Sequence, residues 1–548
     1  MEPTKSKDDI QGPRHVEEVT SVAGDEHVDD WKRLKADATL ATEDEHNTTF
    51  VEGVKRFPKA VFWSCVVSLC IIMDGYDTAL MGGLYVFPAF NKKYGHELLP
   101  DKPGQYGLTA SWQVALGMGA NVGNIIGIAL NGFLTDRYGH KKVLHGALVV
   151  LSGFIFITFF APNVQTLFAG QILCGIPWGI FTTMAPAFAS EVAPVVLRSY
   201  LETWVVTCWG LGQFFSYAVL FTLNEREGHW AYRIPFAVQW VWPVIIIPLA
   251  AFCPESPWWL VRHRQYNKAE RSILRLTSAD TKEIARDRAK KALALMIETN
   301  QLEEEMSRDT SYFACFKGTD LRRTEIAAAA WGSQILTGFV IQGWATYFFK
   351  QAGLSGSNSF KMTLGIGAIH LVCNLISAAV TGNYGRRKVF LYGCVVLTLL
   401  MFLIGGLAFG PLNSTFGYAT SAVYLIWFGV WELSIGPLAY IINGEVSSTR
   451  LRSKTIAIAR GTYVVLNIIN SVAGPYILNP QYGAWRGKAG LLTGGLTIAC
   501  FVWAYFRLPE TRGRTYEELD VLFAEKDLPA KNFAKAVIQR DGGEIRVA

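Results

Sequence analysis

Two aspartates, Asp74 and Asp77, lie in the middle of an otherwise uncharged, mostly apolar stretch from residue 60 to residue 90. They are three residues apart, so a helix places both carboxylates on one face. A helix of about 20 apolar residues spans a bilayer, and a charge near its centre costs at least roughly 2.5–3.5 kcal/mol. Carboxylates at such a position indicate a proton or ligand site that lines an internal cavity. The alternative is a pair satisfied by neighbouring helices or by a helix break at Gly75.

The elements that must position these carboxylates are membrane-spanning helices. Of the 548 residues, 51% are hydrophobic and only 18% are charged, which is low for a water-soluble protein. The net charge of +6 is too small to indicate a nucleic-acid partner. Twelve apolar windows are long enough to span a bilayer, at about 58–90, 109–134, 143–161, 164–190, 199–222, 236–253, 324–350, 360–382, 389–409, 416–443, 455–478 and 488–507.

Basic residues predict the orientation of these spans. The short linkers 135–142, 383–388 and 444–454 each carry three or more Lys or Arg, whereas 351–359 and 410–415 carry none. Basic loops stay in the cytosol, so both termini are expected there, although three lysines in 91–108 weaken the pattern. The predicted organisation is a disordered cytosolic tail (1–57), a six-helix bundle (58–253), a cytosolic linker (254–323), a second six-helix bundle (324–508) and a cytosolic tail (509–548). Apolar residues at helical spacing predict short amphipathic helices in the linker, and a disordered linker is the alternative.

Three short motifs occur once in each half at nearly the same spacing. DRYGHKK (136–142) corresponds to NYGRRK (383–388), EVAPVVLRS (191–199) to EVSSTRLRS (445–453), and PESP (254–257) to PETR (509–512). The repeat predicts two duplicated halves in parallel topology, related by an axis along the membrane normal, with the substrate site near the midplane between them.

The charged residues of these motifs are candidates for an ion-pair network that holds the cytosolic ends of the two halves together in one state and releases them in another. The alternative is that they only anchor the topology. The candidate gating residues are Asp136, Arg137, Glu191, Arg198, Glu255, Arg386, Glu445, Arg452 and Glu510.

These motifs carry a resemblance to a known family. The stretch from Met73 to Gly82, the DRYGHKK turn, PESPWWL (254–260), TYFFKQAG (346–353) and PETRGRT (509–515) are similar to those of major facilitator superfamily sugar porters, and within them to fungal α-glucoside:proton symporters of the maltose permease type. The resemblance implies an all-α membrane protein with twelve transmembrane helices, arranged as two pseudo-symmetric six-helix bundles.

The same resemblance implies substrate-binding residues. Gln213 and Asn467 match sugar-contacting positions of the family, Gln334 matches the first residue of its Gln-Gln pair, and Tyr440 stands where monosaccharide porters have Trp. Ile335 and Val340 depart from the family pattern, and Gln342, further along the same helix, is a candidate to compensate. The alternative for each is an interhelical hydrogen bond. The departures suggest a remodelled, larger site that fits an oligosaccharide.

Asp77 matches the aspartate that binds the proton in the resembled symporters, but Gln171 stands where many of them have an arginine in the fourth helix. Two residues are candidates to take over the role of the missing fourth-helix arginine. Asp74 can share a proton with Asp77, because the second ionisation of a close carboxyl pair is disfavoured. Arg460 can pair with Glu432 or with a helix-one aspartate, the alternative being that it snorkels to the cytosolic surface. The hypothesis is that Asp77 carries the coupled proton and that Asp74 adjusts its affinity.

The predicted function is proton-coupled sugar uptake by alternating access, for α-glucosides or related oligosaccharides such as maltose, trehalose, sucrose or raffinose. A facilitator, a sugar sensor, and a porter for monosaccharides or β-linked disaccharides are the alternatives. No cofactor loop, metal-ligand cluster or nucleophile–base pair occurs in the sequence, so neither an enzyme nor a cofactor is expected. The predicted location is the plasma membrane as a multi-pass monomer, with the sugar, the proton and the bilayer as partners.

Overall fold

The computed structural model describes residues 50–97, 106–278, 281–308, 312–411, 413–447, 451–512 and parts of 514–547, with some side chains inside these ranges left undescribed. Most of the predicted N-terminal tail therefore lies outside the described residues. The chain divides into two compact units. The smaller unit comprises residues up to 62 together with 191–198 and 254–308, and the larger unit comprises 63–190, 199–253 and the chain from 309 onward.

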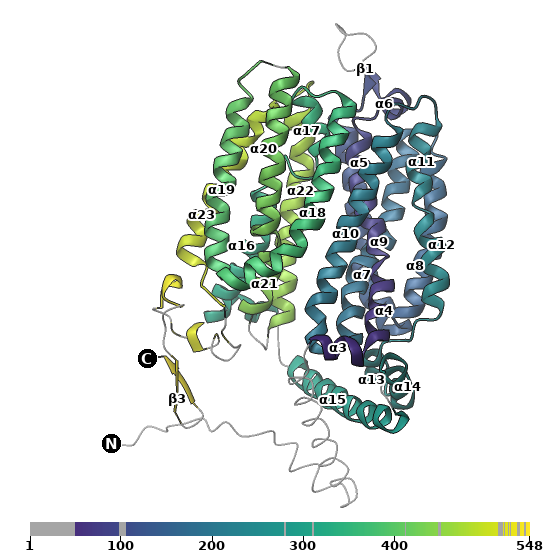
Figure 1. Cartoon of the computed structure of the whole chain (residues 1–548), viewed down its shortest axis with the longest axis vertical. Helices are drawn as coiled ribbons and strands as arrows, with labels where there is room; N and C mark the ends of the chain where they lie inside the picture. Colours follow the sequence, from purple (N-terminus) through teal and green to yellow (C-terminus); the bar gives the residue numbers. More distant parts are fainter. Residues whose placement is uncertain are drawn as a thin grey trace, which may run out of the picture. The chain divides into compact units, whose positions relative to one another are not determined.

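The first half of the larger unit contains the spans expected before the linker (Figure 1). Its helices are α4 (Pro58–Ser68), α5 (Ile71–Leu84), α7 (Ala110–Tyr138), α8 (His140–Phe159), α9 (Val164–Val192), α10 (Val195–Leu223), α11 (Trp230–Val238) and α12 (Val241–Ala251). The helix pairs α4/α5 and α11/α12 each form one interrupted span. Between α5 and α7 lie the short helix α6 (Pro88–Tyr94) and an antiparallel pair of two-residue strands, β1 (His96–Glu97) and β2 (Tyr106–Gly107).

The second half begins after a 3-10 turn, η1 (Tyr312–Phe316). Its helices are α16 (Gly318–Leu336), α17 (Ala345–Gln351), α18 (Gly356–Tyr384), α19 (Arg386–Leu407), α20 (Ser414–Leu433), α21 (Ile435–Val446), α22 (Arg452–Leu478) and α23 (Ala489–Arg507). Short 3-10 turns η2 (Arg486–Lys488) and η3 (Ala530–Asn532) and an antiparallel hairpin of β3 (Ile538–Asp541) and β4 (Glu544–Val547) complete it. The smaller unit contains α3 (Phe50–Arg56), α13 (Pro257–Arg262), α14 (Tyr266–Leu276) and α15 (Lys282–Arg308).

Eleven helices among the described residues are long and apolar enough to cross a membrane. The exception among the twelve predicted windows is 324–350, which the structure divides into α16 and α17. The reason is local backbone geometry: Val340 and Gly343 have φ angles of 68° and 89°, outside the helical region. Asn470 of α22 stabilises this break, because its Oδ1 accepts a hydrogen bond of 2.6 Å from the Val340 backbone N–H.

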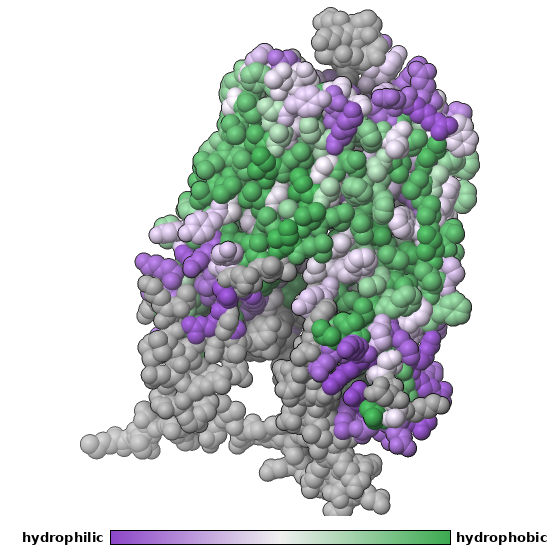
Figure 2. All heavy atoms as spheres, in the orientation of Figure 1, coloured by the Kyte–Doolittle hydropathy of each residue, from purple (hydrophilic) through white to green (hydrophobic). Residues whose placement is uncertain are grey.

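Hydrophobic side chains cover the middle of the long helices, while hydrophilic residues gather at their ends (Figure 2). Many large apolar residues on these helices are exposed, for example Val244 and Leu375. A protein in water rarely exposes so much apolar surface, but a bilayer solvates it. The surface therefore agrees with an all-α membrane protein.

The internal repeat is visible in the backbone. Gly139 separates α7 from α8 with φ 86° and ψ 162°, and Gly385 separates α18 from α19 with φ 85° and ψ 156°. An L-residue with a side chain adopts this positive φ only with strain, so glycine at both positions permits the same tight reversal in each half.

Candidate functional site

Asp77 is enclosed within the first half of the protein. Its carboxyl group is 2% exposed, and its Oδ1 accepts a hydrogen bond of 2.9 Å from the side-chain amide of Gln239, between α11 and α12. The side chain of Gln171, from α9, lies beside the same carboxyl. Gln171 donates to the Met81 sulfur at 3.4 Å, and its buried Oε1 has no hydrogen-bond partner in the described part of the chain. A protonated carboxyl at Asp77 can supply a donor to such an acceptor.

Asp74 lies one turn earlier on α5 and has different neighbours. Its Oδ2 accepts a hydrogen bond of 3.1 Å from the indole N–H of Trp209 on α10. Close helix packing makes this contact possible, since a Cβ at Gly75 would overlap the Trp209 backbone, and one at Gly212 would overlap the Ile72 carbonyl. Asp74 is also within electrostatic reach of Arg460, from the second half. The two aspartates share a helix but not an environment.

Arg460 lies among aromatic rings of α16, α21 and α22. Its guanidinium carbon is 4.4 Å from the ring centre of Trp331 and 4.7 Å from that of Tyr463. Tyr440 packs edge-on against Trp331 at 4.5 Å, and 52% of its surface is exposed. The structure thus brings the predicted residues Arg460 and Tyr440 together through Trp331.

Glu432, one of the partners considered for Arg460, pairs with His370 in the structure. Glu432, near the end of α20, lies 2.7 Å from the Nδ1 of His370 on α18, and both side chains are buried. The break between α20 and α21 at Ser434 ends the helix just after Glu432. Arg460 is exposed, as a snorkelling residue would be, and it also interacts electrostatically with Asp74 of α5.

Three of the predicted sugar-binding residues have side-chain amides without a hydrogen bond to another described residue. Gln213 on α10, Gln342 between α16 and α17, and Asn467 on α22 are partly exposed. None of the three makes a side-chain hydrogen bond within the described ranges, so their amides are available to a ligand. Gln334 differs: it is buried, and its amide donates to the Gly436 carbonyl at the start of α21. Gln334 thus makes an interhelical hydrogen bond, which was the alternative to sugar binding for this residue.

The gating candidates of the second half form a connected group. Arg386, the first residue of α19, makes two hydrogen bonds of 3.1 Å from its Nε to the Glu445 carboxylate, which also accepts 2.6 Å from Thr511. Glu510 accepts from the backbone N–H groups of Arg386 (2.9 Å) and Arg387 (3.2 Å). A carboxylate at the N-terminus of α19 satisfies free amides and complements the helix dipole.

In the smaller unit, Glu191 accepts hydrogen bonds from Ser256 and from Arg262, a partner that the sequence analysis did not include. The neighbouring Glu255 accepts from the Ser256 backbone N–H at 3.1 Å. In the larger unit, Asp136 and Arg137 are exposed at the end of α7. The side chains of Arg198 and Arg452 lie outside the described part of the structure.

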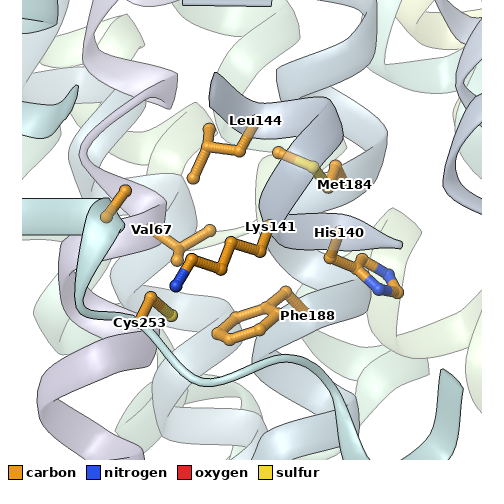
Figure 3. A pocket seen from close by; sticks show the side chains of 8 residues that line it. Val67, His140, Lys141, Leu144, Met184, Phe188 and Cys253 are labelled. Carbon is orange, nitrogen blue, oxygen red and sulfur yellow. The ribbon is translucent and has the colours of Figure 1, made fainter. Parts of the chain in front are cut away.

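A small pocket in the first half lies apart from the residues above (Figure 3). Val67, Leu144, Met184, Phe188, Ala250 and Cys253 line it together with His140 and Lys141. Lys141 donates to the Ala251 carbonyl at 2.6 Å, so its ammonium group fixes the end of α12. None of the predicted sugar or proton residues lines this pocket.

Sequence reasoning missed four polar residues that position the site: Trp209, Gln239, His370 and Asn470. All four lie inside apolar windows, which is a signal for a buried hydrogen bond. Trp, Gln and Asn are neutral, and His can be neutral at pH 7. A search for charged residues within the spans therefore does not find these four.

Comparisons with known proteins agree with this architecture. Residues 63–523 match the family model described as "Sugar (and other) transporter". The general alpha-glucoside permease of Saccharomyces cerevisiae is 35% identical over 96% of this chain and 86% of its own length. A maltose permease of the same yeast is 34% identical over 91% of this chain and 81% of its own length.

Among solved structures, the xylose transporter of E. coli in a partially occluded inward-open conformation superposes with a TM-score of 0.66. It is 20% identical, and the match covers 83% of this chain and 99% of that chain. This likeness shows the major facilitator fold. The chain belongs to the sugar transporter family of the major facilitator superfamily, and it is related to yeast α-glucoside and maltose permeases.

Proposed function

We propose that this protein is a proton-coupled uptake transporter for an α-glucoside or a related oligosaccharide, such as maltose, trehalose, sucrose or raffinose. The observation that carries the proposal is Asp77, a carboxyl group buried at mid-helix whose neighbours are the neutral amides of Gln239 and Gln171. Burial without a cation disfavours a permanent charge. A group that must take up and release a proton fits this environment better than a fixed structural ion.

A neutral sugar gains nothing from the membrane potential, so uphill uptake needs an accompanying ion. Asp77 binds the proton in the outward-facing state and releases it in the inward-facing state. Asp74 adjusts the proton affinity of Asp77, because the two carboxyl groups interact electrostatically. Asp74 also interacts electrostatically with Arg460. In this account, Arg460 replaces the fourth-helix arginine that many resembled symporters have at the position of Gln171.

The sugar would bind through uncommitted amides and aromatic faces. Gln213, Gln342 and Asn467 supply donors and acceptors for hydroxyl groups. Tyr440, which is exposed and packs against the buried Trp331, supplies an apolar ring face for the C–H side of a pyranose. The names of the yeast relatives, which describe permeases for α-glucosides and maltose, support this substrate class.

Alternating access would rock the halves 58–253 and 324–508 around this site. The Arg386–Glu445–Glu510 group would fix the cytosolic end of the second half, and the Glu191–Glu255 group that of the first. We place the protein in the plasma membrane as a monomer with both termini in the cytosol, as the basic linkers suggest.

Uptake of radiolabelled maltose into cells that express the protein tests the proposal. With an inward proton gradient, the label accumulates against its concentration gradient, and a protonophore abolishes the accumulation. Equilibration without accumulation would indicate a facilitator, and absence of flux with every sugar of a competition panel would indicate a sensor. Unlabelled trehalose, sucrose, raffinose, lactose and glucose in that panel define the specificity.

A further inference from the structure

The second half contains a buried titratable pair that the account above does not use. His370 on α18 is 4% exposed and Glu432 on α20 is 7% exposed. The His370 Nδ1 and the Glu432 Oε1 are 2.7 Å apart, the distance of a charge-assisted hydrogen bond. The other imidazole nitrogen, Nε2, is buried and has no hydrogen-bond partner among the described residues. Of the two imidazole nitrogens, Nδ1 thus has a hydrogen-bond partner among the described residues and Nε2 does not.

An ionised glutamate inside a membrane protein is costly unless a partner offsets its charge. His370 is such a partner, because an imidazole can donate from Nδ1 whether or not Nε2 carries a proton. A proton added at Nε2 would create an imidazolium–carboxylate pair without breaking the existing hydrogen bond. The pair therefore has a place to hold a proton, and the orphan Nε2 is that place.

The His370 ring lies at a contact between the two halves of the larger unit. A Cβ at Gly210 of α10 would overlap the ring. The adjacent Trp209 contacts the ring edge-on, with 6.0 Å between centres, and the same indole donates to Asp74. The contacts thus run from Asp74 through Trp209 and His370 to Glu432, and so connect the helix-one carboxyl to the second half.

Other contacts show that this is a continuous seam between α10 and α18. Asn374 donates to Thr207 at 3.3 Å, one turn beyond His370. Gly367, one turn before it, lies close to Phe214. The seam is tight around the imidazole, so water reaches Nε2 only when α10 and α18 separate.

We propose that the His370–Glu432 pair is a second proton-binding site of the transport cycle, which exchanges its proton with water when α18 moves away from α10. The inference rests on the proposed proton-coupled transport and adds a site in the opposite half. In the separated state, water donates a proton to Nε2, and the imidazolium keeps its Nδ1–H bond to Glu432. When α10 and α18 are apart in the state that faces the compartment of lower proton activity, Nε2 returns the proton to water.

Several groups set the electrostatic surroundings of this pair. Cys373, on the same helix as His370, interacts with Glu432. Asp74 faces the pair from α5 across the Trp209 indole, and Asp77 and Arg460 act on Asp74 from α5 and α22. The contacts of Trp209 with both Asp74 and the His370 ring are the physical basis for coupling the two proton sites.

The test uses the purified full chain with Glu432→Gln, which keeps the shape of the side chain but removes the carboxylate that stabilises an imidazolium at His370. A sugar-free proton titration in detergent micelles should show one proton fewer exchanged by the variant than by the wild type. In proteoliposomes, maltose counterflow should persist but lose the wild-type dependence on pH. Glu325→Gln is the matched control for counterflow, because Glu325 pairs with Arg507 away from this group, and this variant should keep the wild-type dependence on pH.

Identical titration curves, or an identical pH profile of counterflow, for Glu432→Gln and wild type would overturn the proposal. Loss of maltose affinity with an unchanged titration would do the same, because it would make Glu432 a sugar ligand. If Glu432→Gln does not elute as a monodisperse protein, His370→Asn gives the same test, since its amide keeps a donor near Glu432. Failure of the wild type to transport maltose, trehalose, sucrose or raffinose would refute the proposed function, while the sugar-free titration would still decide on the proton site.

Discussion

Asp74 and Asp77 lie one turn apart on α5, yet their carboxyl groups contact different parts of the protein. Within the described residues, the side chains that hydrogen-bond Asp77 are the neutral amides of Gln239 and Gln171, from its own half. Asp74 accepts a hydrogen bond from Trp209 and interacts electrostatically with Arg460, which belongs to the other half. The first environment suits a group that alternates between charged and neutral. The second suits a group whose electrostatic surroundings change when the two halves move relative to each other.

The amides of Gln213 and Gln334 provide a matched comparison at the same scale. Gln213→Ala is expected to raise the KM for the sugar by about 2- to 10-fold, the equivalent of one lost hydrogen bond of about 0.5–1.5 kcal/mol. Gln334→Ala should instead lower thermal stability, since its amide donates to the Gly436 carbonyl. Concentration-dependent uptake and melting curves of the two purified variants distinguish these effects. Equal loss of affinity in both would show that Gln334 binds sugar directly.

The break between α16 and α17 is the element that departs most from the sequence-based expectation. Window 324–350 is apolar enough to predict one continuous span. A hydrogen bond from Val340 to Asn470, 130 residues later, helps to hold the chain in a non-helical conformation there. The break leaves Gln342 outside the helix and partly exposed. A ligand-binding position in a transporter often needs such an interruption.

Asn470→Ala should destabilise this break. The Val340 N–H would lose its buried acceptor, at a cost of about 1–3 kcal/mol, and the melting temperature should fall. Asn467→Ala, one turn earlier on α22, is the matched control for stability, because the Asn467 side chain makes no hydrogen bond among the described residues. Thermal unfolding of both variants in the same detergent gives the comparison, and an equal melting temperature for Asn470→Ala and wild type would contradict the account.

The turn between α18 and α19 makes a second prediction for an element. Gly385 has φ 85°, and a Cβ there would lie 2.7 Å from a carboxyl oxygen of Glu510. Gly385→Ala should cost about 1–2 kcal/mol from the backbone alone and should displace Glu510 from the start of α19. Gly444→Ala is the control, because a Cβ at this position in α21 meets no neighbouring atom within 4 Å. Unchanged stability and transport in Gly385→Ala would argue against a role for this turn.

At the scale of the whole molecule, the two halves of the larger unit contact each other at several places. Tyr85, just after α5, stacks on Trp344 before α17 with 5.3 Å between ring centres. Gly82 of α5 approaches the Gly343 carbonyl, where a Cβ would be only 3.1 Å away. The seam between α10 and α18 and the contact of α7 with α22 add long helices to these contacts between the halves. Such contacts can separate without unfolding the helices themselves.

Much of this architecture could be predicted from the sequence, because the cost of polar groups in lipid leaves a strong signal. Apolar windows, basic linkers and repeated motifs indicated the spans and their duplication. Asp74 and Asp77 were found because charges stand out in such windows. Gln239 and His370 were missed because nothing in a window indicates which distant side chain a neutral polar residue will contact. The pairing of Glu432 required knowledge of how α20 faces α18.

The central claim is that a proton bound at Asp77 enters with the sugar. Addition of maltose to a lightly buffered suspension of cells that express the wild type should make the medium alkaline. Asp77→Asn keeps the shape of the side chain but carries no exchangeable acid, so it should abolish this alkalinisation while maltose counterflow persists. Asp287→Asn, on the exposed surface of α15, is the control and should behave as wild type. Undiminished alkalinisation in Asp77→Asn would contradict the account.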